Sequence, residues 1–82
     1  MYIRYFILDT KQEVIVRNLA IMNGKPTING TRITVELILK KLSEGATVVD
    51  LLKIYPQITT SQILATLDYA ATIISNEELL DV

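Results

Sequence analysis

The chain has 82 residues, half of them hydrophobic, and its 8 basic and 9 acidic side chains give a formal net charge of −1. This length fits one domain, and the near-zero charge argues against a strong non-specific hold on DNA or on an anionic membrane. Cysteine and histidine are both absent, which excludes disulfides, thiolate zinc sites and the usual general base of neutral-pH catalysis.

The hydrophobic content is high for so short a chain, because a small domain buries only a modest share of its surface. We therefore expect a partner to cover part of the apolar surface, most simply a second copy in a homodimer. The apolar runs are far shorter than the ~20 residues that cross a bilayer, and the start lacks the pattern of a signal peptide. These features predict a cytoplasmic protein without membrane association.

A β-hairpin is predicted over residues 2–17. Residues 2–8, YIRYFIL, and residues 13–16, EVIV, are rich in β-branched and aromatic side chains, and the polar DTKQ between them has hairpin length. Both faces of the first strand are partly apolar. Such a hairpin is marginal alone and requires a sheet, a helix or another chain beside it.

A turn-rich segment, NGKPTINGTRIT, follows at residues 23–34 and is either a phosphate-binding loop or a folded connector. In a Walker loop, Gly-Lys precedes Ser or Thr, whereas here Lys25 precedes Pro26. The sequence therefore favours a connector, in which the Asn-Gly pairs make turns, the second closing a short hairpin, and Arg32 hydrogen-bonds carbonyls or a carboxylate. The residues of this structural motif are Gly24, Lys25, Pro26, Gly30, Thr31 and Arg32.

Helical periodicity begins after the connector. Thr34 is expected to cap a first helix, which Gly45 ends. Thr47 and Asp50 form a capping-box pattern at the start of a second helix, which Pro56 ends. The side chains expected to face the core are Val35, Ile38, Leu39 and Leu42 in the first helix and Val48, Leu51, Leu52 and Tyr55 in the second.

A third helix is expected from Thr59 or Thr60, where Thr59 and Gln62 fit another capping box, to about Asn76. Its predicted core stripe consists of Ile63, Leu67, Ala70 and Ile74. A second stripe consists of Thr66, Tyr69 and Ile73. This second stripe is either a surface for a partner protein or a face that the N-terminal hairpin covers within the same chain.

Together these elements predict an α+β, mainly α fold, with an N-terminal β-hairpin followed by three helices in a helix-turn-helix-like arrangement. We divide the chain into a hairpin extension (1–20), a helix-turn-helix-like domain with its turn-rich connector (21–76) and a C-terminal tail (77–82). The tail either adds a further helical turn or frays. The carboxylates are scattered over different elements, and no spacing suggests a carboxylate pair or a Ser-Lys arrangement. We therefore expect no enzyme, no metal site and no cofactor.

The last two helices have the proportions of a DNA-binding helix pair. The polar tip of this pair would be Thr60, Ser61 and Gln62. Its phosphate contacts would come from Lys40, Lys41, Lys53 or the Arg32 loop. Residues 57–76 contain no lysine or arginine, so we expect weak DNA binding by this chain alone. The alternative is that the polar residues simply cap a packing helix.

Several short motifs between residues 20 and 75 occur together: Gly24-Lys25-Pro26, Gly30-Thr31-Arg32-Ile33, Glu44-Gly45, Tyr55-Pro56 and Leu67-x-Tyr69-Ala70. As a set they resemble the small prokaryotic proteins of the domain-of-unknown-function 433 family. The resemblance implies a homeodomain-like helix-turn-helix fold and an antitoxin-like role, in which the chain binds a PIN-like ribonuclease toxin. Segment 1–17 has no fixed counterpart in the shared motif. The alternatives are a free-standing DNA-binding regulator and a structural or assembly module without a nucleic-acid role.

Overall fold

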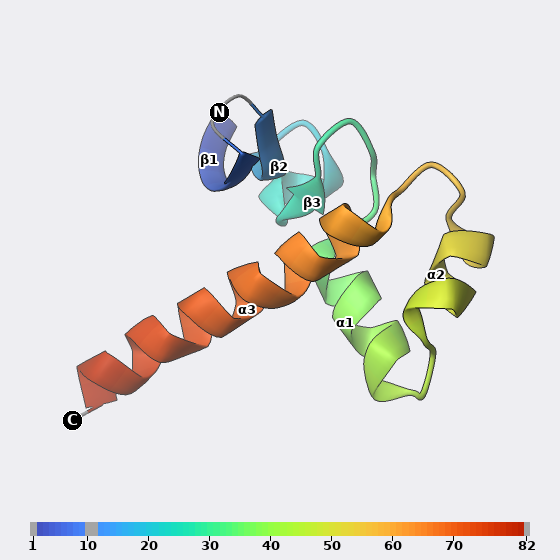
Figure 1. The fold of residues 1–82 in the computed structure, drawn as a ribbon. Coiled ribbons are helices and arrows are strands. Elements are labelled where there is room, and N and C mark those ends of the chain that lie inside the picture. The colour runs from blue at the N-terminus through green and yellow to red at the C-terminus, as the bar shows by residue number, and fades with distance from the viewer. Residues whose placement is uncertain (1, 10–11, 82) are drawn as a thin grey trace.

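The fold consists of a small antiparallel sheet followed by three helices (Figure 1). The structure is a computed structural model that describes residues 2–9 and 12–81, with side chains placed over residues 14–76. Its elements are β1 (Tyr2–Asp9), β2 (Gln12–Asn18), a 3-10 turn η1 (Met22–Gly24), β3 (Thr27–Ile28), α1 (Val35–Ser43), α2 (Val48–Ile54) and α3 (Thr60–Asp81). The predicted class, a hairpin followed by three helices in a mainly α domain, is confirmed.

The sheet has the order β1-β2-β3, and both pairs of neighbours are antiparallel. The predicted hairpin is therefore present, with Tyr2 opposite Asn18 at its open end. The third strand was not predicted to join this sheet. It pairs Ile28 with Ile15 of β2, and both of these side chains are fully buried.

The connector folds around two tight turns. In the first, Met22, Asn23 and Gly24 all have positive φ, at 50°, 58° and 80°. Gly24 is buried, and a Cβ there would lie 2.9 Å from Cδ2 of Leu19. In the second, the Thr31 amide donates to the Ile28 carbonyl at 3.0 Å, which confirms the predicted turn at Asn29-Gly30.

The arginine that fixes the connector is not the predicted one. Arg17 Nε donates a 2.8 Å hydrogen bond to the Gly24 carbonyl oxygen. Arg32 is exposed, and its side chain makes no hydrogen bond or ion pair with the part of the chain that the structure describes. The prediction for Arg32 was therefore wrong, because the Gly30 turn directs residue 32 outward while β2 brings Arg17 beside the first turn.

Helix α1 has the predicted start and end. The Thr34 hydroxyl accepts a hydrogen bond from the Leu37 amide at 3.0 Å. At the other end Gly45 has φ 101°, its amide donates to Leu42, and the Ala46 amide donates to Lys41. This pair of bonds is a Schellman motif, which satisfies carbonyls that the end of a helix would leave unpaired.

Both remaining helices begin with a reciprocal capping box, as the sequence predicted. In α2 the Thr47 hydroxyl accepts from the Asp50 amide at 3.1 Å while the Asp50 carboxylate accepts from the Thr47 amide at 2.9 Å. In α3, Thr59 and Gln62 exchange equivalent bonds at 3.2 and 2.9 Å. Each box satisfies two backbone amides that would otherwise lack a partner in the first turn.

Helix α3 is longer than predicted. It runs unbroken from Thr60 to Asp81, through the boundary drawn between residues 76 and 77. Its 22 residues correspond to about 33 Å, and its C-terminal half extends beyond the other elements (Figure 1). Residues 77–81 therefore continue the helix as backbone, which agrees with the first of the two possibilities given for the tail.

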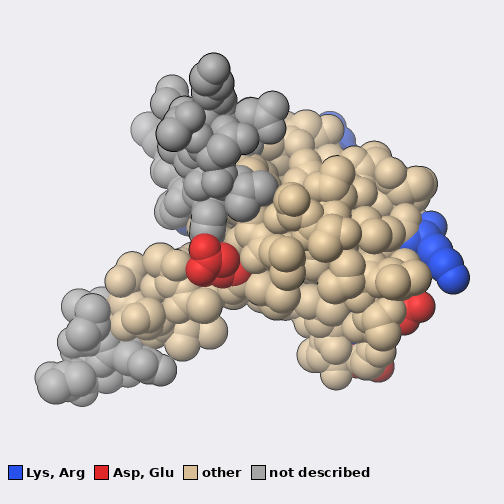
Figure 2. All heavy atoms as spheres, viewed as in Figure 1, with Lys and Arg blue, Asp and Glu red and all other residues tan. Residues whose placement is uncertain are grey.

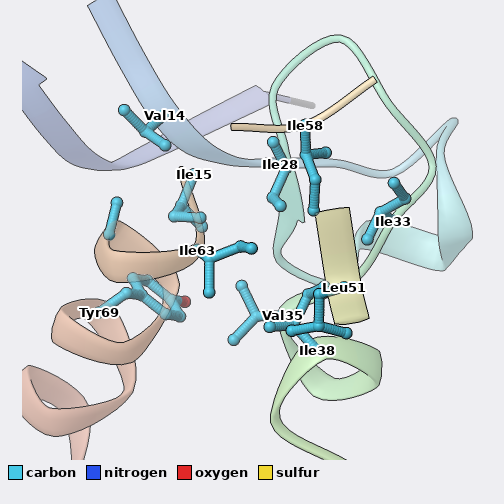
Figure 3. Packing of buried hydrophobic residues seen from close by; sticks show 11 residues of the cluster. Val14, Ile15, Ile28, Ile33, Val35, Ile38, Leu51, Ile58, Ile63 and Tyr69 are labelled. Atoms are coloured by element: carbon cyan, nitrogen blue, oxygen red, sulfur yellow. The ribbon is translucent and has the colours of Figure 1, made fainter. Parts of the chain in front are cut away.

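A single hydrophobic cluster joins the sheet to all three helices (Figure 3). Its fully buried members are Ile15 and Ile28 from the sheet, Ile38 from α1, Leu51 from α2 and Ile63 from α3. Burial of one such side chain stabilises a fold by about 1.5–3 kcal/mol. The core residues predicted for α1 and α2 all lie in this cluster or pack against it.

The predicted core face of α3 was only partly right. Ile63 is buried and Ala70 half-buried, but Leu67 and Ile74 are 40% and 54% exposed. Conversely, Thr66 and Tyr69, predicted as an exposed partner surface or a face covered by the hairpin, are buried at 0% and 5%.

For these two residues the second alternative is therefore correct: they are covered within the same chain. Helix α3 packs against β1 and β2, and Tyr69 belongs to the same buried cluster as Val14 and Ile15 of β2 (Figure 3). Thr66 tolerates this position because its hydroxyl donates to the Gln62 carbonyl at 3.0 Å, one turn back in the same helix.

Candidate protein-binding site

An open apolar groove of about 550 Å³ lies between α1 and α3. Its floor and walls come from three places: the connector, one side of α1 and the middle of α3. The lining residues are Pro26, Val35, Glu36, Leu39, Lys40, Ser43, Tyr69, Ala70, Ile73 and Ile74. Most of these side chains are apolar, so the groove fits a nonpolar side chain or helix face better than a polar metabolite.

The sequence places these residues together through two helical faces. In α1, Val35 and Leu39 are four residues apart, and in α3, Tyr69 and Ile73 are also four apart, so each pair lies on one side of its helix. Pro26 closes the connector end, where its carbonyl accepts from the Val35 amide at 2.9 Å. Of the three residues predicted as a partner surface, the groove thus contains Tyr69 at its edge and Ile73, which is 37% exposed.

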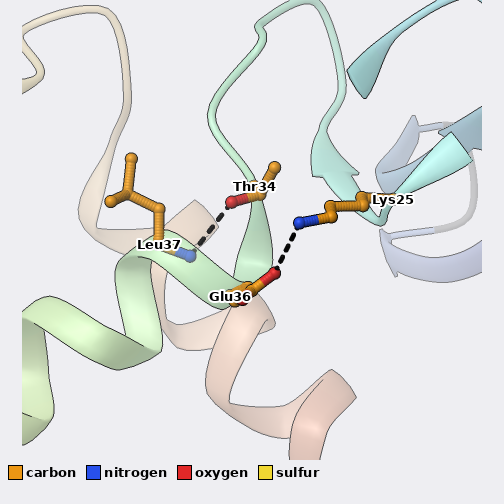
Figure 4. A network of polar contacts seen from close by, with 4 residues as sticks. All are labelled: Lys25, Thr34, Glu36 and Leu37. Atoms are coloured by element: carbon orange, nitrogen blue, oxygen red, sulfur yellow. Dashed lines mark hydrogen bonds and ion pairs between the residues drawn. The ribbon is translucent and has the colours of Figure 1, made fainter. Parts of the chain in front are cut away.

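An ion pair lies at the rim of the groove (Figure 4). Lys25 Nζ is 3.1 Å from Oε1 of Glu36, which stands in the first turn of α1 next to the Thr34 cap. Both side chains are more than half exposed, so the pair contributes at most about 1 kcal/mol. Its structural effect is to tie the connector to α1 beside Pro26.

The residues predicted to contact DNA are spread over three helix ends. Lys40 and Lys41 lie in the last turn of α1, Lys53 in the last turn of α2, and the polar tip of Thr60, Ser61 and Gln62 in the first turn of α3. The last turn of α1 and the first turn of α3 lie at different ends of the helical part (Figure 1). The α1 lysines therefore do not flank the polar tip.

The polar tip itself is mixed in character. Thr60 and Ser61 are exposed, whereas Gln62 is half-buried and its Oε1 accepts the Thr59 amide in the capping box. Figure 2 shows the face around α3 as largely uncharged, with acidic atoms over α3 and basic atoms at the edge beside α2. The first turn of α3 contains no acidic residue, so it would not repel a phosphate, but it offers no cationic side chain either.

The electrostatics around Asp50 support folding rather than chemistry. Hydrogen bonds from the Thr47 amide and hydroxyl to Asp50, aided by nearby Lys53, lower the pKa of the Asp50 carboxyl below its ordinary value. Over the described residues, no group of three His, Cys, Asp or Glu side chains could hold a metal ion. The groove remains the feature best suited to binding.

The exposed face of α3 was missed at the sequence level. Leu64, Leu67, Ala71 and Ile74 are all exposed and recur at intervals of three, four and three residues. That spacing was visible in the sequence, but two of these residues were assigned to the core.

Fold and groove together define a small, mainly α domain that presents apolar surface on its last helix. A family model described as "Protein of unknown function (DUF433)" matches residues 15–70, more than half of the chain. The chain belongs to the DUF433 family. A search of curated proteins and a search of solved structures gave no match.

The matched region runs from β2 to the middle of α3 and includes the connector, both capping boxes and most of the groove lining, but not Ile73 and Ile74. The predicted family is therefore confirmed. Within the described part of the chain, no helix has the length and apolar character needed to cross a membrane.

Proposed function

We propose that this protein is a non-catalytic, antitoxin-like binding protein that holds a PIN-like ribonuclease toxin through the groove between α1 and α3. The observation that carries the proposal is the groove itself, an open and mainly apolar groove with a volume of about 550 Å³ on a chain of only 82 residues. Contiguous exposed apolar surface on a small domain typically marks a site for another protein. The motif resemblance to antitoxin-like members of the family supports the identity of that protein.

The groove suits a helix or an extended segment of the toxin better than a rigid flat surface. Ile73 and Ile74 form one wall and Val35 and Leu39 the other, so an inserted apolar side chain would contact both helices. Lys40 and Glu36 at the rim offer one charge of each sign. Such an arrangement of an apolar centre and a polar rim is common at protein interfaces.

The test is neutralisation of the small PIN-like nuclease expected to be encoded beside this gene. The wild-type chain should co-purify with the nuclease and restore growth to cells that express it. Ile73→Glu, which places a charge in the groove, should abolish both effects. Val49→Glu is the matched control, because Val49 is an exposed residue of α2 outside the groove.

Equal melting temperatures of the two variants would show that the loss is local. The proposal fails if Ile73→Glu neutralises as well as the wild type, or if the neighbouring nuclease does not bind the wild-type chain.

A second candidate is a free-standing DNA-binding regulator. The feature that favours it is the α2–α3 helix pair, whose five-residue connection leads into the exposed Thr60 and Ser61. The lack of Lys or Arg from residue 57 to 76 weighs against it. Nuclease neutralisation without DNA binding would separate the two functions. The remaining alternative, an assembly module, would show neither nuclease neutralisation nor DNA binding.

A further inference from the structure

Helix α3 has a second apolar face that the described part of the chain leaves exposed. We call it the seam and define it as Leu64, Leu67, Ala71 and Ile74. The three large side chains are 54%, 40% and 54% exposed, and Ala71 is exposed as well. The buried face, which includes Ile63, Thr66 and Tyr69, lies roughly 130° around the helix, at about 100° per residue.

The spacing of the seam identifies the kind of surface that fits it. Intervals of three, four and three residues are the a and d positions of a heptad, the pattern by which one helix packs along another. A groove-binding loop or a metabolite would not require three turns of aligned apolar side chains. The natural occupant is therefore a second helix with the same periodicity.

We propose that the occupant is α3 of a second copy of this chain, packed antiparallel about a twofold axis near residue 69. In that register Leu64 lies opposite Ile74 of the second copy, and Leu67 opposite its Ala71. Each of these pairs then joins an a position of one helix to a d position of the other, and no leucine lies opposite a leucine. The seam of one copy is therefore complementary to the seam of the other, as a twofold-symmetric dimer requires.

The charges at the two ends of α3 favour antiparallel over parallel packing of the two helices. Its last turns carry Glu77, Glu78 and Asp81 and no basic residue, while its first turn carries no acidic residue. Acidic groups are unfavourable at a helix C-terminus and favourable near an N-terminus.

Antiparallel packing brings position 78 of one copy opposite Thr60, the first residue of the other helix. Parallel packing would place the two acidic ends side by side. The dimer thus places the acidic C-terminal end of each helix beside the N-terminal end of the partner helix, where the helix dipole favours negative charge.

This inference is independent of the proposed toxin site, since Leu64 and Leu67 do not line the groove. Only Ile74 belongs to both surfaces. Substitutions at 64 and 67 therefore test the dimer, and Ile73→Glu tests the toxin site.

The first experiment is sedimentation equilibrium at micromolar concentration. The wild type should have twice the chain mass, and so should the control Val49→Glu. Leu67→Glu brings two carboxylates, one from each copy, together near the twofold axis. Leu64→Glu places a carboxylate opposite Ile74 at each end of the seam. Either change should weaken the dimer about a hundredfold or more, through lost burial and added charge. A monomeric wild type, or folded Glu variants that remain fully dimeric, would overturn the proposal.

The second experiment fixes the direction of packing. The chain has no cysteine, so introduced thiols report on the interface without interference. A disulfide needs Cα atoms within about 7 Å, which the proposed register provides between position 64 of one copy and 74 of the other. Mixed Leu64→Cys and Ile74→Cys chains should cross-link to each other under mild oxidation, and Leu64→Cys alone should not. Efficient cross-linking of Leu64→Cys with itself would show parallel packing and contradict the proposal.

Discussion

Arg17 and Gly24 are joined by a 2.8 Å hydrogen bond from the guanidinium Nε to the backbone carbonyl. The bond spans the left-handed turn of Met22, Asn23 and Gly24 and ties it to the end of β2. Because the same turn leads into Pro26 at the groove and then into β3, this contact positions the connector end of the proposed binding site. Loss of this hydrogen bond should therefore lower the free energy of unfolding measurably.

We expect Arg17→Ala to lower the free energy of unfolding by about 1–2 kcal/mol, because it leaves the carbonyl of buried Gly24 without its charged donor. Arg32→Ala is the matched control. Arg32 is exposed, and a surface change of this kind stays within about 0.5 kcal/mol. Urea unfolding monitored by circular dichroism measures both. A larger loss for Arg32→Ala than for Arg17→Ala would contradict the assignment of the connector contact.

Tyr69→Ala should destabilise the fold by about 3–5 kcal/mol, since it empties a site in the cluster between α3 and the sheet. Thr72→Ala, three residues further along the same helix at an exposed position, should change stability by no more than about 0.5 kcal/mol. Thermal melts of both variants provide the comparison. Similar melting temperatures would mean that residue 69 does not face the core.

The Asp50 capping box should make stability depend on acidity. Its folded-state pKa lies below the ordinary value of 3.8, so the ionised cap stabilises the fold above that value and loses this effect as pH falls through the folded pKa. Asp50→Asn should therefore be less stable than the wild type at pH near 7, and the difference should shrink in acid. Denaturant titrations over a series of pH values test this. A difference that stayed constant into strong acid would not come from the carboxylate.

DNA binding by the isolated chain should be weak and only shallowly dependent on salt. Each phosphate contact adds about 0.9 to the slope of log affinity against log salt, and the three candidate lysines lie at the ends of two different helices. Fluorescence anisotropy against the gene's own upstream region, with Lys40→Ala, Lys41→Ala and Lys53→Ala, measures the slope and its source. Nanomolar, sequence-specific binding by the isolated protein near physiological salt would favour the regulator instead.

Local signals predicted most of this fold. Thr34, Thr47 and Thr59 each begin a helix as expected, because a capping bond is formed within four residues and depends on little else. Gly45 ends α1 for a similarly local reason, its positive φ. The DUF433 motifs are concentrated in these same turns and caps, which is why the family was also accessible from sequence.

What could not be predicted depends on contacts between distant residues. The sequence of α3 is apolar around most of its circumference, so periodicity alone could not decide whether Tyr69 or Leu67 faces inward. Packing against β2 decided it, and the buried Thr66 hydroxyl bonds within its own helix. Likewise, Thr27 and Ile28 are too short a segment to signal that they would join the sheet of the N-terminal hairpin. They become one only because β2 lies beside them. The groove depends on both of these outcomes.

Helix α3 contributes Ile63, Ala65, Thr66 and Tyr69 to the interior, yet it is the last of the described elements to leave the ribosome. The inner side chains of the sheet, including Ile15 and Ile28, therefore stay open to water until the final third of the chain has been made. With synthesis at about 5–20 residues per second, that interval lasts on the order of a second, longer than many small domains need to fold. The nascent sheet is thus the stage at which this chain is most exposed to misassembly, and completion of α3 ends it.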